Sequence, residues 1–80
     1  PEMRVQILSE VSEFIRQGKS VFSKHIIAYD PTRHIGQEVF VVNEKDQLLA
    51  VGKLILPPIY IPFTKVGSAV RIRKGSLEEE

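Results

Sequence analysis

Residues 38–56, EVFVVNEKDQLLAVGKLIL, contain two apolar runs separated by a short polar segment. The runs 38–42 and 48–56 have the composition of strands, and the five residues between them, 43–47, have the length of a hairpin loop. Gly52 lies inside the second run, where a glycine indicates a β-bulge or the close approach of another backbone. This stretch therefore predicts two strands joined as a hairpin.

A short helix is predicted before this hairpin, within residues 9–18, SEVSEFIRQG. Its apolar side chains recur at helical spacing and share one face: Val11, Phe14 and Ile15. Ser9 can cap the free N–H groups at the start of the helix, and Gly18 can adopt the left-handed conformation that ends it. We expect one amphipathic helix over this segment.

The remaining segments complete a β-rich pattern. Residues 4–8, RVQIL, alternate as a half-buried strand does, and residues 19–29 predict a loop that leads into a strand. Residues 30–36, DPTRHIG, have the composition of a turn that Asp30 begins. Residues 57–63, PPIYIPF, predict an irregular apolar crossing, because their prolines lack backbone donors. Residues 69–74, AVRIRK, predict the closing strand.

The length of 80 residues limits the chain to one domain. It is too short for parallel strand–helix–strand crossovers, so a small, mostly antiparallel barrel or sandwich of about five or six strands is expected, with a helix over one opening. We place the folded domain at residues 1–75 and an acidic tail at 76–80, SLEEE. The start at Pro1, with Met3 inside, favours an excised piece of a longer protein.

The composition narrows the classes of function. The absence of cysteine excludes disulfides and thiolate metal sites and suits a reducing, cytoplasmic setting. No apolar run approaches the roughly 20 residues that span a bilayer, so no membrane association is expected. His25 and His34 lack the spacing of a metal-ligand pair, and we predict neither a metal nor a cofactor. Glu38 and Glu44 are interpreted as solubilising charges. No nucleophile motif or phosphate loop is present, so catalysis by this chain is not predicted.

Positive charge is concentrated near the closing strand. The net charge of the chain is +1, yet residues 50–75 contain no acidic residue and five basic ones, Lys53, Lys65, Arg71, Arg73 and Lys74. Strand parity assigns one face to the core, with Val66, Val70 and Ile72, and leaves the other face with Lys65, Gly67, Ala69, Arg71 and Arg73. Such a face suits a phosphate backbone, or it protects a sheet edge from aggregation. The residues alone do not separate these interpretations.

Residues 18–25, GKSVFSKH, form a second candidate surface. Lys19 and Lys24 surround the aromatic Phe22, a combination that can contact phosphates and stack on bases. A lone aromatic in such a run belongs more often to the core, so the core is the preferred interpretation of Phe22. Arg33, in the turn that follows, is interpreted as a surface charge that can extend the basic face.

Three segments taken together, 18–26, 30–53 and 65–73, resemble the PUA domain, an RNA-binding module named after pseudouridine synthases and archaeosine transglycosylases. The resemblance runs from Val5 to about Lys74 and is strongest to the archaeal form at the C-terminus of archaeosine tRNA-guanine transglycosylases. It implies a pseudobarrel of about six mainly antiparallel strands with one or two short helices. The archaeal pattern carries a small polar turn where this chain has the apolar PPIYIPFTK.

The resemblance also implies an RNA surface built from the segment after the first helix and from the last strand. The residues predicted to contact RNA are Lys19, Ser20, Lys24, His25, Lys65, Gly67, Arg71, Arg73 and Lys74. The predicted function is to dock structured RNA, with tRNA as the preferred partner, for a separate RNA-modifying catalytic domain in the same or a parent chain. The alternative is a protein-interaction or structural module in which residues 57–63 form an exposed apolar patch.

Overall fold

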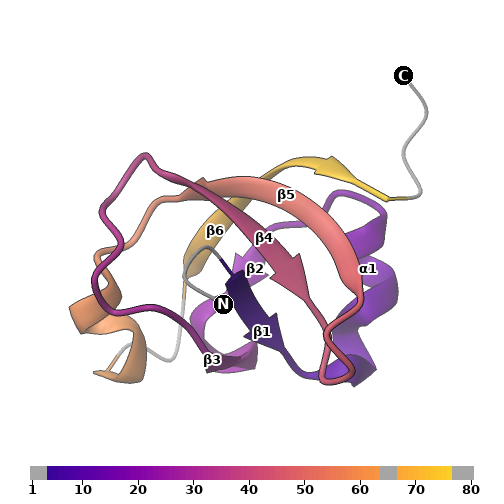
Figure 1. Ribbon diagram of the computed structural model, residues 1–80, viewed down its shortest axis with the longest axis horizontal. Helices are drawn as coiled ribbons and strands as arrows, with labels where there is room; N and C mark the ends of the chain where they lie inside the picture. Colours follow the sequence, from indigo (N-terminus) through magenta and orange to yellow (C-terminus); the bar gives the residue numbers. More distant parts are fainter. Residues whose placement is uncertain (1–3, 64–66, 77–80) are drawn as a thin grey trace.

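The computed structural model describes residues 4–63 and 67–76, which form a six-stranded sheet that curls into a nearly closed barrel (Figure 1). The strands lie in the order β2-β6-β5-β4-β1-β3. Their bounds are β1 Arg4–Ile7, β2 Val21–Phe22, β3 Ile26–Ala28, β4 Glu38–Val42, β5 Leu48–Leu54 and β6 Ser68–Gly75. β1 runs parallel to β4, and the other strand pairs among the described residues are antiparallel. This confirms the small, mainly antiparallel barrel.

Helical segments are short. They are the 3-10 turns η1 Ser9–Val11, η2 Ser23–His25 and η3 Pro58–Phe63, and the α-helix α1 Ser12–Arg16. Figure 1 shows α1 and η3 at opposite ends of the long axis of the molecule. No helix in the described part of the chain is long and apolar enough to cross a membrane.

The predicted hairpin is confirmed as β4 and β5, and Gly52 accounts for how β6 packs beside it. Gly52 pairs with Val39 on one side and with Ile72 on the other, and the β5–β6 ladder contains a bulge between Val51 and Gly52. A Cβ atom on Gly52 would overlap the carbonyl oxygen of Arg71. Both predictions for Gly52, a β-bulge and the close approach of another backbone, are therefore confirmed.

We expect Gly52→Ala to destabilise the domain by about 3 kcal/mol, because the methyl group meets backbone atoms that cannot rotate away. Urea unfolding measures this change in free energy. Lys53→Ala is the matched control in the same strand, since Lys53 is exposed, and it should change stability by no more than about 0.5 kcal/mol. Equal stability of the two variants would contradict the close approach.

The core lies inside the barrel, where strand alternation directs the apolar side chains. In β1, Val5 and Ile7 are buried while Arg4 is exposed, as the alternating pattern predicts. One cluster contains the buried apolar residues Val5, Ile7, Ile15, Val21, Val39, Val41, Leu49, Ala50, Leu54, Ile61, Ala69 and Val70. Each strand except the short edge strand β3 thus contributes fully buried side chains to one core.

The predicted helix differs in detail from the structure. Residues 9–11 form a 3-10 turn before the α-helix begins, which changes the residue repeat from 3.0 to 3.6 within one short segment. Val11, Phe14 and Ile15 share one face as expected, since all three line the same open pocket, but Ile15 is buried whereas Phe14 is 59% exposed. Ser9 makes no cap; its hydroxyl accepts a hydrogen bond of 3.2 Å from the Glu44 amide. Gly18 has a φ of 97° and ends the helix as predicted.

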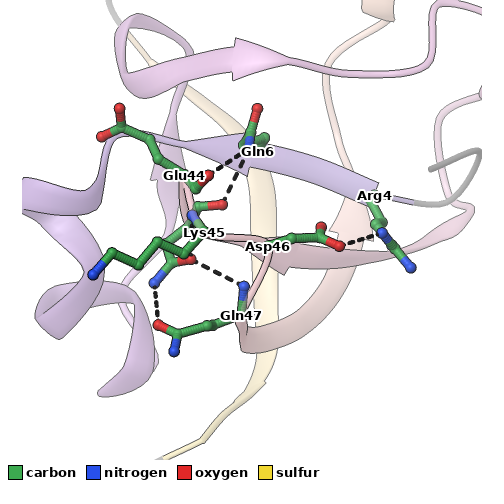
Figure 2. A network of polar contacts seen from close by, with 7 residues as sticks. Arg4, Gln6, Glu44, Lys45, Asp46 and Gln47 are labelled. Carbon is green, nitrogen blue, oxygen red and sulfur yellow. Dashed lines mark hydrogen bonds and ion pairs between the residues drawn. The ribbon is translucent and has the colours of Figure 1, made fainter.

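The tip of the β4–β5 hairpin is built around Asn43. Figure 2 shows the turn, with Lys45, Asp46 and Gln47 labelled. The Asn43 side chain is nearly buried, and its Oδ1 accepts hydrogen bonds from the amides of Lys45 at 2.9 Å and Gln47 at 3.0 Å. Its Nδ2 donates to the side-chain oxygen of Gln47 at 2.9 Å. Arg4 on β1 pairs with Asp46 in the same turn at 2.5 Å, which ties the tip to the neighbouring strand. One amide side chain therefore organises the loop.

Asn43→Ala should destabilise the domain by about 2–3 kcal/mol, because the variant leaves two backbone donors of the turn without their acceptor. Asn43→Asp keeps the acceptor oxygen and should cost about half as much. Thermal and urea unfolding of both variants provide the comparison. If the Asp variant were as unstable as the Ala variant, the acceptor role of Oδ1 would be wrong.

Glu44 also has a structural role that the sequence interpretation omitted. Its Oε2 accepts a hydrogen bond of 2.9 Å from the Ser9 amide, so the hairpin turn is fixed to the start of η1. The predicted turn at residues 30–36 is confirmed, with Asp30 accepting hydrogen bonds from the Thr32 amide at 2.9 Å and hydroxyl at 2.6 Å. These bonds hold the pKa of Asp30 below its usual value, and its carboxylate is a turn-former.

Residues 57–63 do not form a strand, as predicted, but they are more regular than expected. Residues 58–63 form the 3-10 helix η3, which buries Pro58 and Ile61. The other large side chains of η3 face outward: Ile59, Tyr60 and Phe63. The segment is therefore anchored to the core on one side and exposes an apolar surface on the other.

Candidate nucleic-acid interface

An open groove of about 650 Å³ lies between α1, the segment that follows it and the start of β6. Its lining is mainly apolar and includes two phenylalanines and a histidine: the groove is formed by Val11, Phe14, Ile15, Lys19, Ser20, Phe22, His25 and Ser68. Residues far apart in the sequence meet here because β2 pairs with β6, which places Phe22 beside Ser68. We call this surface the groove.

Exposed aromatic side chains are the main feature of the groove. Phe14 and Phe22 are 59% and 44% exposed, and the rings of Phe22 and His25 lie 6.2 Å apart between centroids with a tilt of 36°. The preferred interpretation of Phe22 as a core residue is wrong. Val21 is fully buried, and the next side chain in a strand points to the other side. The groove therefore offers flat rings on which planar groups can stack.

Three residues predicted to contact RNA line the groove: Lys19, Ser20 and His25. Lys24 is exposed on η2 but is not part of the lining. Gly67 is exposed at a φ of 94°, and its carbonyl accepts a hydrogen bond of 3.3 Å from the Ser23 amide. Ser68 also lines the groove, although the sequence prediction omitted it. In the sequence, Ser68 lies between the small residues Gly67 and Ala69, and this pattern could have indicated that Ser68 belongs to the accessible surface.

A row of charged side chains extends from the groove across the outside of the sheet. Arg71 pairs in register with Lys53 on β5, which in turn pairs with Glu38 on β4. All three are exposed. Val21 pairs with Val70, so in the antiparallel register Ser20 of the groove lies beside Arg71. We call Lys53, Arg71 and Arg73 the basic face, and it continues the groove.

The basic face is less uniformly positive than the sequence indicates. Arg73 pairs with Glu38, with the guanidinium nitrogen 2.9 Å from the carboxylate oxygen. Residues 50–75 contain no acidic residue, but the pairing of β4 with β5 places Glu38 beside Lys53. Glu38 is therefore more than a solubilising charge, since it restrains Arg73. Within residues 4–63 and 67–76, neither Arg71 nor Lys53 forms an ion pair with a carboxylate.

The parity prediction for the closing strand is correct at Val70, Arg71 and Arg73, but wrong at Ala69. Ala69 is fully buried, whereas it was expected on the accessible face. The β2–β6 ladder pairs Val21 with Val70 and Phe22 with Ser68, so Ala69 is an extra residue that breaks the alternation.

Three other basic residues were considered for the RNA surface from the sequence. Two of them do not line the groove, and the third is not among the described residues. Lys74 on β6 is half-buried and has an interaction partner. Lys65, like Val66, lies outside the described residues. Arg33 is partly buried, with its guanidinium 3.5 Å from Asp30, so it belongs to the turn and does not extend the basic face.

Comparison with known proteins assigns the chain to a family. The model of the PUA domain matches residues 3–75. The tRNA-guanine(15) transglycosylase of Methanococcus aeolicus is 47% identical over 75 residues, which cover 94% of this chain and 12% of that protein. The corresponding protein of Pyrococcus abyssi is 41% identical over 75 residues, covering 94% and 13%. The chain thus spans about an eighth of the length of these relatives.

A solved structure agrees with this assignment. A conserved PUA domain protein from Thermoplasma acidophilum superimposes with a TM-score of 0.90 at 26% identity, covering 98% of this chain and 52% of that one. The match includes nearly all of the barrel described above. The chain therefore belongs to the PUA domain family, whose members bind RNA.

Proposed function

We propose that this chain is a non-catalytic module that docks structured RNA, with tRNA as the preferred partner, and positions it for a separate catalytic domain. The observation that carries the proposal is the apolar groove with exposed aromatic rings, flanked by cations that have no carboxylate partner within the described residues. The relatives that are 47% and 41% identical are tRNA-guanine(15) transglycosylases, which supports tRNA as the partner.

Two kinds of contact contribute to the proposed binding: base stacking in the groove, and contacts between cations and phosphates. An unpaired base of the RNA stacks on Phe14, Phe22 or His25 in the groove, a contact worth about 1–3 kcal/mol per base and tolerant of sequence. Lys19 at the groove and Arg71 and Lys53 on the basic face contact the adjoining phosphates. Such contacts fix the position of the RNA without reading its sequence. A docking module needs this property.

We expect Lys19→Gln/Arg71→Gln to weaken tRNA binding and its dependence on salt. Each lost phosphate contact lowers the slope of log K against log salt by about 0.7–0.9, so the double variant should be shallower by about 1.4–1.8. Fluorescence titrations of a tRNA transcript at several salt concentrations measure the slope.

Arg4→Gln/Lys45→Gln is the matched control, since it removes the same formal charge from β1 and the hairpin turn. It should leave the slope nearly unchanged. If both double variants lost the same slope, binding would depend on net charge alone and the assignment of the surface would be wrong. If the unmodified chain did not bind tRNA at low salt, the function itself would be wrong.

Glu38→Gln should strengthen tRNA binding about two- to fivefold at low salt, because it releases Arg73 from an exposed ion pair of the kind worth about 0.2–1 kcal/mol. The same titration measures this change. Asp46→Asn is the control: it releases Arg4 on β1, which β4 and β5 separate from β6, and should change the affinity less than twofold. Equal gains in both variants would show that Arg73 has no particular place in the interface.

A further inference from the structure

A second exposed surface lies at the end of the barrel where β5 finishes. It contains large apolar side chains that are exposed by 42% to 80%: Ile35, Ile55, Ile59, Tyr60 and Phe63. Gly36, next to Ile35, donates a hydrogen bond of 2.7 Å to the Leu54 carbonyl, which brings the 30–36 turn to the end of β5. We call these five side chains the apolar end.

The apolar end is unsuited to RNA and large for a surface without a partner. No charged residue occurs from position 54 to position 63, so nothing in this segment attracts phosphates. Tyr60 and Phe63 are 55% and 80% exposed, which for aromatic side chains leaves on the order of 300 Å² of ring surface in water. With the three isoleucines, the area reaches the size of patches that mark protein contacts.

The path of the chain indicates which protein surface covers this patch. β1 is parallel to β4, with Arg4 paired to Phe40 in the middle of β4, so β1 runs away from the end of the barrel where β4 begins. β4 begins where β5 finishes, because the two strands are antiparallel and Glu38 pairs with Lys53. Followed backwards to Arg4, β1 therefore points toward the apolar end.

The last described strand finishes at the opposite end. β6 runs antiparallel to β5 and finishes at Gly75, which packs against the backbone of Arg16 at the end of α1. Figure 1 places η3 and α1 at opposite ends of the molecule. The first described strand thus points back toward the apolar end, whereas the last described strand finishes beside α1.

The relatives have long additional sequence, since this module makes up 12% and 13% of the two transglycosylases. The module resembles their C-terminal part, so that sequence precedes it. We propose that the apolar end packs against a folded domain that precedes this module in the same polypeptide. η2, which carries His25 of the groove, packs against η3 of the apolar end. The contact thus fixes the orientation of the groove relative to the preceding domain.

Hydroxyl-radical footprinting tests this contact in the natural full-length polypeptide that carries residues 1–80, with the isolated chain as reference. Oxidation of Tyr60 and Phe63 should be at least fivefold slower in the full-length protein. Phe14 and Phe22 lie in the groove and serve as internal standards, whose oxidation should be the same in both proteins. Equal oxidation of Tyr60 and Phe63 in the two proteins would overturn the proposal, as would a full-length polypeptide with no domain before the module.

Two double variants separate this proposal from RNA binding. Ile59→Ser/Phe63→Ser should abolish the protection of Tyr60 in the full-length protein while the isolated chain keeps its tRNA affinity. Phe14→Ser/Phe22→Ser should do the reverse, with weaker tRNA binding and unchanged protection. Loss of tRNA binding in the first variant would instead assign the apolar end to the RNA surface.

Sedimentation of the isolated chain tests a second copy as the occupant. The proposal predicts a monomer. A dimer that dissociates on Ile59→Ser/Phe63→Ser would show that the apolar end joins two copies of this chain, and would overturn the assignment to a preceding domain.

Discussion

The close approach of the β5 and β6 backbones at Gly52 is the contact on which the rest of the structure depends. Because Gly52 has no side chain, the carbonyl of Arg71 can lie against it, and β6 fits between β5 and β2. Val70 is then fully buried in the core, and the Arg71 side chain lies on the outer surface. The same strand places Ser68 at the groove. A single packing contact thus positions both parts of the proposed RNA surface.

The described surface of this small barrel has two chemically different regions. The groove and the basic face combine exposed rings with cations, which suits a polyanion that has unpaired bases. The apolar end has rings without cations, which suits protein. The positive charge of the basic face is also partly neutralised, since Glu38 holds Arg73 in an ion pair. In an RNA-docking module of the kind proposed, such an ion pair weakens binding, because every uncompensated cation strengthens it.

Local patterns were sufficient for much of the fold. The hairpin, the turn at Asp30 and the bulge at Gly52 follow from residue types that act over a few positions, and the structure confirms them. The errors arose where distant segments meet. Ala69 turns inward because of how β6 pairs with β2, and the pairing of Arg73 depends on β4. The exposure of Phe22 follows from Val21 filling the core, which no local pattern reveals.

The place of β6 in the sheet has a consequence for how the protein is made. β6 is the last of the described strands along the sequence, yet it lies between β2 and β5. During synthesis, β2 and β5 therefore cannot be joined until the residues of β6 have left the ribosome, because among the described strands β2 pairs with β6 alone. A chain that terminates early lacks Ser68 and Arg71 and leaves Val21 in water. Such a chain has an incomplete barrel and lacks part of the proposed RNA surface, so both the fold and the proposed binding depend on β6.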